Sequence, residues 1–96
     1  MNYRNVYRAL SMKNGVNILM EIYAGCKIEE YKTFSDLRKT YKMSEFTLRR
    51  ITNRLSSCGL IKSIKANRED GRARVYVVEN ADLCESIKCL TQEMMK

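Results

Sequence analysis

Apolar residues recur at helical spacing along the first third of the chain. Residues 13–24 are apolar around much of a helical circumference, as expected for a central core helix, and Gly25 is a plausible end for it. A shorter amphipathic helix is predicted before it, over residues 3–10. Its apolar positions are separated by three, one and three residues: Tyr3, Val6, Tyr7 and Leu10.

Two further helices are predicted in the middle of the chain, each behind a capping residue. Thr33 precedes an acid, Asp36, by three positions, which is a weak form of the capping box. Ser44 is the second N-cap, and the helix that follows, 44–58, ends before Gly59 in the position where a left-handed glycine is expected. Its apolar residues lie within an arc of about 80° on one face: Leu48, Ile51, Leu55 and Cys58.

Strand-like alternation replaces the helical spacing in the last third. Segments 61–66 and 73–78 are rich in Ile, Val and Tyr, and the Asp-Gly pair between them is typical of a hairpin turn. Asn80 then caps a last helix over 81–95, whose narrow seam consists of Leu83, Ile87, Leu90 and Met94. The predicted order, α-α-α-α-β-β-α, is mainly helical with one β-hairpin and matches a winged helix-turn-helix.

Composition limits the classes of protein that this chain can be. Its 96 residues suffice for a single domain, 1–96, with an apolar fraction of 45%. The absence of His removes the commonest general base and zinc ligand, and we expect neither an enzyme, a metal site nor a cofactor. No apolar run is long enough to span a membrane and the N-terminus lacks a signal sequence, so we expect a cytoplasmic protein.

The positive charge is concentrated in one segment. The whole chain carries a net charge of +7, whereas residues 38–74 hold 11 basic and three acidic residues, a net charge of +8. The remainder is therefore close to neutral, at −1. A segregated excess of this kind favours a polyanionic partner such as nucleic acid over a merely solvated surface.

The polar face of the 44–58 helix carries side chains that can read DNA bases. A helix in the major groove needs an apolar inner face for anchorage and hydrogen-bond donors on its outer face. Arg can bind guanine, Asn can pair with adenine, and Phe or Thr can contact a thymine methyl. Phe46 has a second interpretation, a peripheral contact with the preceding helix or the hairpin. The alternative is an ordinary solvated polar face, which two adjacent arginines and Arg54 disfavour. The candidates on this face are Phe46, Arg49, Arg50, Asn53 and Ser57, with Arg54 one turn beyond Arg50.

The hairpin tip carries a second basic cluster. Arg68, Arg72 and Arg74 surround Gly71, which suits contact with the DNA backbone or the minor groove. Asp70 could orient Arg72 by pairing with it, or the turn could simply be solvated.

Two segments of the chain resemble the corresponding segments of a known family. Residues 43–55 and 59–61 resemble the recognition helix of MarR-type winged-helix regulators, and 70–75 is similar to the Asp-x-Arg-Ala wing signature of that family. The resemblance covers about residues 14–79 and implies a homodimeric, sequence-specific regulator of transcription that binds double-stranded DNA. It implies that Arg72 reaches the minor groove and that the major groove is read by Ser44, Phe46, Thr47, Arg49 and Arg50.

The flanking helices are shorter than those of MarR regulators. The chain is therefore more similar to the small winged-helix proteins of archaea and archaeal viruses, for which the location would be the host cytoplasm. No small-molecule effector is indicated. The two terminal helices, outside the 14–79 core, could simply complete the core of one subunit, but we favour packing across the twofold axis of a homodimer. The predicted interface residues are Tyr3, Val6, Tyr7, Leu10, Leu83, Ile87, Leu90 and Met94.

The four cysteines are too dispersed for a zinc site. Cys58 lies on the apolar arc and is expected to be buried. Cys84 and Cys89 lie about 140° apart on the last helix, so at most one of them could form an intersubunit disulfide. Two alternatives to a DNA-binding regulator stay open: a winged-helix module that binds an acidic protein, and a regulator that responds to thiol oxidation.

Overall fold

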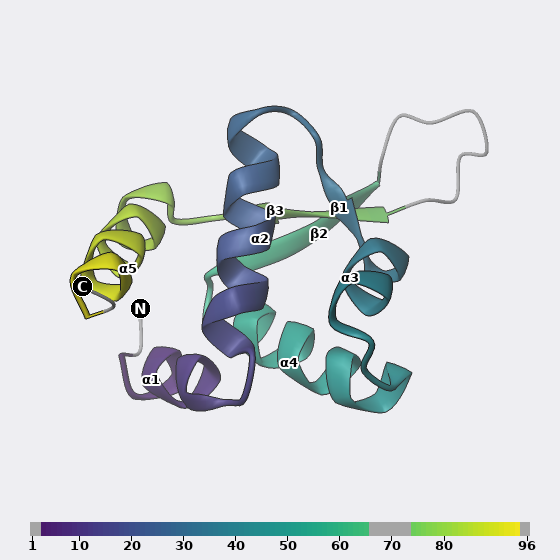
Figure 1. Cartoon of the computed structure of the whole chain (residues 1–96), viewed down its shortest axis with the longest axis horizontal. Helices are drawn as coiled ribbons and strands as arrows, with labels where there is room; N and C mark the ends of the chain where they lie inside the picture. Colours follow the sequence, from purple (N-terminus) through teal and green to yellow (C-terminus); the bar gives the residue numbers. More distant parts are fainter. Residues whose placement is uncertain (1–2, 66–73, 95–96) are drawn as a thin grey trace.

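The computed structural model describes residues 3–65 and 74–94. The chain is mainly helical, with one small sheet (Figure 1). The elements, in chain order, are α1 (Tyr3–Ser11), α2 (Gly15–Lys27), β1 (Lys32–Thr33), α3 (Phe34–Tyr41), α4 (Glu45–Ser57), β2 (Ile61–Lys65), β3 (Arg74–Val78) and α5 (Ala81–Met94). All seven elements expected from the sequence are present within one or two residues of their predicted ends, except at the end of α2.

The sheet contains three antiparallel strands in the order β1-β3-β2. Val75 of β3 lies opposite Ile64 of β2 on one side and Thr33 of β1 on the other. The sequence predicted only a two-stranded hairpin, because β1 has two residues and no alternation can be seen in so short a segment. This third strand joins the wing to the residue that caps α3.

Two glycines permit close approaches of the backbone. Gly25 does not end α2, as we expected; the helix continues to Lys27. A Cβ atom at Gly25 would lie 2.6 Å from the carbonyl oxygen of Glu30, and the Glu30 amide donates to the Gly25 carbonyl over 2.9 Å. A Cβ atom at Gly15 would likewise lie 2.4 Å from the carbonyl oxygen of Ala9, so Gly15 lets α1 pack tightly against the start of α2.

The predicted helix starts are confirmed in detail. The Asp36 amide donates to Thr33 Oγ1 over 3.1 Å, and the Thr33 amide donates to the Asp36 carboxylate over 3.0 Å, which is a complete capping box. The Thr47 amide donates to Ser44 Oγ over 3.2 Å at the start of α4. Gly59 has a φ of 84°, the left-handed conformation expected after this helix.

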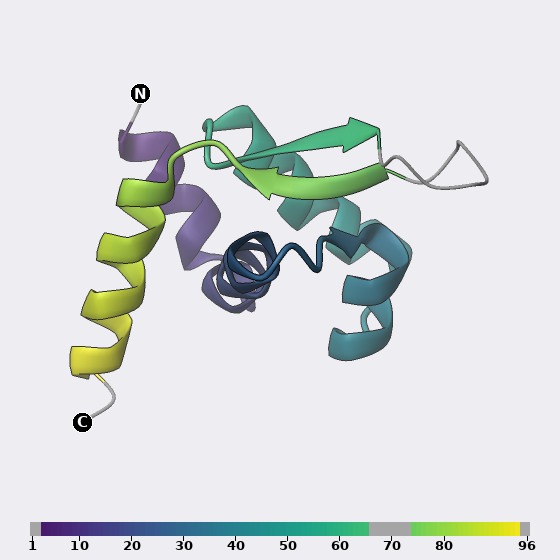
Figure 2. The same cartoon turned by 90° about the horizontal axis from the view of Figure 1, so that it is seen from above.

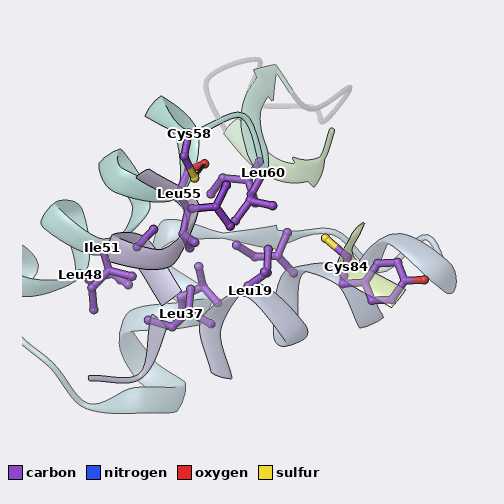
Figure 3. Close-up of a cluster of buried hydrophobic side chains, with 14 residues drawn as sticks. Leu19, Leu37, Leu48, Ile51, Leu55, Cys58, Leu60 and Cys84 are labelled. Atoms are coloured by element: carbon purple, nitrogen blue, oxygen red, sulfur yellow. Dashed lines mark hydrogen bonds between the residues drawn. The ribbon is translucent and has the colours of Figure 1, made fainter. Parts of the chain in front are cut away.

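The apolar face of α4 is buried against α2 and the sheet (Figure 3). Leu48 and Leu55 have no exposed surface and Ile51 and Cys58 have almost none, which confirms the predicted arc. The buried residues that surround them are Ile18, Leu19, Ile22, Leu37, Leu60 and Ile61. This core holds α4 with its other face outward.

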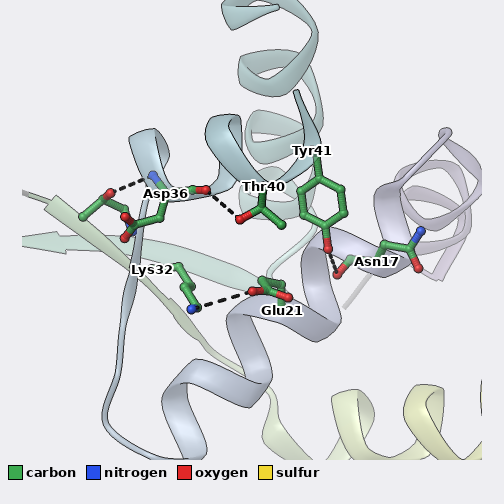
Figure 4. A network of polar contacts seen from close by, with 7 residues as sticks. Asn17, Glu21, Lys32, Asp36, Thr40 and Tyr41 are labelled. Carbon is green, nitrogen blue, oxygen red and sulfur yellow. Dashed lines mark hydrogen bonds and ion pairs between the residues drawn. The ribbon is translucent and has the colours of Figure 1, made fainter. Parts of the chain in front are cut away.

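Polar contacts fix α3 and β1 against α2 (Figure 4). The Tyr41 hydroxyl at the end of α3 donates to the Asn17 carbonyl oxygen over 3.0 Å. Lys32 in β1 forms an ion pair with Glu21, with 3.7 Å between Nζ and Oε1. Because α3 leads directly into α4, these contacts also fix the start of α4.

The last helix packs at the end of the molecule opposite α3 (Figures 1 and 2). Glu85 of α5 accepts hydrogen bonds from the Tyr23 hydroxyl and from Lys27 Nζ, both on α2. These two donors lower the pKa of Glu85 below its ordinary value, and the same hydrogen bond raises the pKa of Tyr23. None of the helices that the structure describes is long and apolar enough to cross a membrane.

Candidate nucleic-acid interface

The outer face of α4 carries most of the side chains that were predicted to read DNA. At 100° per residue, Phe46 and Asn53 lie opposite the buried arc and form the outward line of the helix. Phe46 is 78% exposed, which favours its interpretation as a ligand contact over a peripheral packing contact. Arg49, Arg50 and Arg54 are also exposed, on the two sides of this line.

Ser44 and Thr47 are committed to the start of the helix. The Ser44 hydroxyl donates to Thr47 Oγ1 over 2.9 Å while it accepts from the Thr47 amide. Both residues are exposed, but their first structural role is to cap α4. The Thr47 hydroxyl keeps its own proton for donation to a base, whereas donation from the Ser44 hydroxyl to a base would break its bond to Thr47 Oγ1.

One flank of α4 faces the wing. The Arg49 guanidinium lies 4.5 Å from the ring centroid of Phe34 and forms an ion pair with Glu45 at 3.2 Å. Arg74 of β3 donates from Nε to Ser63 Oγ and from Nη2 to the Ser63 carbonyl oxygen, both over 2.9 Å. We call the surface between them the wing-side groove; it is lined by Thr33, Phe34, Ser35, Arg49, Ser63, Arg74 and Tyr76.

The other flank of α4 faces α1. We call the hollow there the α1-side depression, and its lining contains three arginines and no carboxylate: Asn5, Arg8, Arg50, Asn53, Arg54 and Ser57. The sequence analysis missed Asn5 and Arg8, because they lie more than 40 residues before Arg50 and only the packing of α1 on α4 brings them together. The sequence indicated only that Arg8 lies on the polar face of its helix, and not that this face adjoins α4.

A third basic surface lies on α3. Arg38, Lys39 and Lys42 line a shallow hollow together with Ser35 and Met43. These three cations contribute to the +8 segment, yet the sequence analysis did not place them in the binding site. The structure therefore extends the basic surface from α4 onto the helix before it.

Two solved structures share this arrangement over nearly the whole chain. HlyU from Vibrio cholerae superposes with a TM-score of 0.74 at 14% identity, covering 98% of this chain and 92% of its own. A point mutant of MepR from a multidrug-resistant S. aureus clinical isolate superposes with a TM-score of 0.67 at 17% identity, covering 99% and 79%. The fold is a winged helix.

This likeness rests on three-dimensional structure. No family profile and no curated protein sequence matches the chain. The winged-helix fold implied by the resemblance to MarR-type regulators is confirmed, whereas an archaeal or viral origin stays a prediction.

Part of the predicted wing lies outside the described residues of this winged helix. Arg68, Arg72 and the Asp70-Gly71 turn belong to residues 66–73. Of the three wing arginines, Arg74 is described. It pairs with Lys65 at the end of the strands that adjoins residues 66–73, and its side chain lies beside Ser63.

The terminal helices of the winged helix expose only part of the apolar set predicted for the dimer interface. Val6 is only 6% exposed and packs in the core of its own subunit, so its predicted place in a dimer interface is wrong. Leu10, Leu83 and Ile87 are partly buried against the same core. The most exposed apolar residues here are Tyr3 and Tyr7, each 73% exposed, and Leu90, 65% exposed; the side chain of Met94 is not described.

The cysteines are sorted by burial. Cys84 has no exposed surface, and burial raises its pKa to about 11, so of the two candidates for an intersubunit disulfide Cys84 is out of reach of a partner. Cys58 is buried as expected, and burial raises its pKa too. Cys89 is exposed on α5 and is the cysteine that a partner could reach.

Proposed function

We propose that this winged helix is a transcription regulator that binds double-stranded DNA in a sequence-specific manner. The observation that carries the proposal is the exposed face of α4, on which Phe46, Arg50 and Asn53 point away from the core. A single α-helix fits the major groove, which is about 12 Å wide. The superposition with HlyU and MepR supports the winged-helix fold on which this proposal depends.

The base-reading roles follow from position on α4. Arg50 and Asn53 can form bidentate hydrogen bonds with guanine and adenine, and Phe46 can contact a thymine methyl. Arg49 and Arg74 line the wing-side groove and suit the sugar–phosphate backbone. The wing arginines predicted from sequence, Arg68 and Arg72, are proposed to extend this contact toward the minor groove.

We propose that the regulator acts as a homodimer. Tyr3 and Tyr7 on α1 and Leu90 on α5 expose large apolar surfaces on the two terminal helices. Burial of these side chains against a second copy would remove apolar surface from water. A twofold dimer would place two copies of α4 about 34 Å apart, one turn of DNA.

Selection of bound duplexes from a random pool tests this function. We expect enrichment of a pseudo-palindromic site whose half-sites are centred about one helical turn apart. Binding should weaken steeply with salt, because each neutralised phosphate releases counterions. A pool that yields no enriched sequence, together with an affinity that salt leaves unchanged, would contradict the proposal and favour the protein-binding alternative.

Exposure of Cys89 supports a test of the thiol-responsive alternative. A disulfide between Cys89 of two subunits would link the dimer through α5. Comparison of DNA affinity with and without reductant, in the natural chain and in Cys89→Ser, would reveal this regulation as a difference that the variant abolishes.

A further inference from the structure

The α1-side depression brings together three guanidinium groups without any acid to balance them. Arg8 comes from α1, Arg50 comes from the middle of α4, and Arg54 lies one turn further along α4. Within the described part of the chain, none of the three forms an ion pair, although Arg49 nearby does. The hollow is therefore lined by three positively charged side chains that are exposed to solvent.

This arrangement is built into the fold. Val6 and Ala9 of α1 are buried in the core, and Arg8 lies about 100–160° away from them around the helix. The packing of α1 on α4 therefore leaves Arg8 exposed beside α4. Arg50 and Arg54 are four residues apart on α4, a spacing at which like charges destabilise a helix. An anion bound in the depression would attract both arginines and offset their mutual repulsion.

The angular position of the arginines on α4 assigns them to different parts of a duplex. Phe46 and Asn53 lie on the outward line, whereas Arg54 lies about 80–100° to one side and Arg49 about 40–60° to the other. When the outward line faces the floor of a major groove, the two flanks face the phosphates of the two strands. Arg49 then approaches one strand and Arg54, beside Arg8, approaches the other.

We infer that α1 and α4 together form a phosphate-binding site, in which Arg8 and Arg54 hold one backbone phosphodiester of duplex DNA. Guanidinium groups bind phosphate oxygens through paired, charge-assisted hydrogen bonds. The inference rests on the proposed function and adds α1 to the DNA-binding surface. Inorganic phosphate has the same chemistry, and the experiment below distinguishes the two sources.

The test measures the salt dependence of DNA affinity for the full chain and for Arg8→Gln, Arg54→Gln and the double variant. Each single variant should weaken binding about tenfold at low salt. It should also lower the slope of log K against log salt by about 0.9 per subunit. The loss should be equal on the selected site and on unrelated duplexes, because a phosphate carries no sequence information. The double variant should lose less binding free energy than the two single variants lose together, because both arginines hold the same phosphate.

Two control variants separate a phosphate contact from a structural effect. Lys88→Gln removes one positive charge from the surface between α2 and α5, where no lining residue belongs to α1 or α4, and should leave the slope unchanged. Arg8→Lys keeps the positive charge, so the slope of log K against log salt should stay close to that of the natural chain. Thermal unfolding of every variant checks that α1 still packs, and sedimentation checks its oligomeric state.

The possible outcomes are distinct. If the natural chain binds its selected site but Arg8→Gln keeps the full slope and affinity, the inference is overturned and the proposed function stands. If the natural chain binds no duplex, both are overturned. If the DNA-free chain binds inorganic phosphate saturably, as followed by NMR signals of the arginine side chains, and Arg8→Gln changes only that binding, the site belongs to a free anion and the DNA assignment is wrong.

Discussion

Both flanks of α4 carry arginines, but those on the wing side are held by neighbouring side chains and those on the α1 side are not. On the wing side, Arg49 stacks on Phe34 and pairs with Glu45, and Arg74 is bonded twice to Ser63. On the α1 side, the described structure gives Arg8, Arg50 and Arg54 no carboxylate partner. A restrained arginine has lost its rotamer freedom before binding, whereas an unrestrained one loses it on binding and adapts to more geometries.

This difference indicates that the two flanks of α4 have separate roles in DNA binding. Restrained side chains on the wing side suit a fixed register on one strand. Unrestrained side chains on the α1 side keep more positive charge available for the other strand. Four substitutions test whether the two flanks differ in this way.

Replacement of Leu55 by Ala would remove the support that both flanks share. Leu55 has no exposed surface, so the cavity left behind should lower the free energy of unfolding by about 2–5 kcal/mol. Urea denaturation followed by circular dichroism measures this loss. Ser56→Ala, at the exposed neighbouring position, is the matched control and should change stability little; a similar loss in both variants would mean that the packing of Leu55 is not the cause.

Replacement of Arg50 by Ala should separate base reading from phosphate binding. We expect specific binding to weaken by about 1–3 kcal/mol, with a relaxed base preference at one position of the site. Selection from a random pool with the variant measures the preference. If the selected sequence is unchanged, Arg50 does not read a base and belongs with Arg54.

Replacement of Phe34 by Leu should loosen Arg49 while keeping an apolar side chain beside α4. The cation–π contact at 4.5 Å would be lost, and we expect DNA binding to weaken by about 0.5–1 kcal/mol. Titration of a labelled duplex measures the change. An unchanged affinity in a correctly folded variant would show that the restraint on Arg49 contributes nothing to binding.

Replacement of Glu45 by Gln should have the smallest effect and opposite signs in two assays. Loss of the exposed ion pair with Arg49 should lower the free energy of unfolding by about 0.2–0.5 kcal/mol. DNA affinity should rise, because a carboxylate next to the phosphates is removed. A fall in both quantities would indicate that Glu45 orients Arg49 for binding.

The helices of this fold are predictable from sequence because their signals are local. The buried arc of Leu48, Ile51 and Leu55 and the caps at Thr33 and Ser44 depend on residues three or four positions apart. The strand β1 was missed because it consists of two residues that pair only with a segment more than 40 residues away.

The candidate site was predictable only where it lies on one helix. The exposed face of α4 follows from its apolar face, but Arg8 enters the site through packing between α1 and α4. The same reason explains the error at Val6. Its position on an amphipathic helix shows that the side chain is buried, but not whether its own subunit or a partner buries it.

The close contact at Gly15 makes the position of α1, and of the exposed side chains on α1, depend on a buried residue. A single methyl group there would meet the Ala9 carbonyl oxygen and push α1 away from α2 as a rigid unit. Arg8, Tyr3 and Tyr7 would move with it, although none of them touches residue 15. Among natural variants of this chain, we therefore expect position 15 to be as restricted in residue type as the positions on the exposed face of α4.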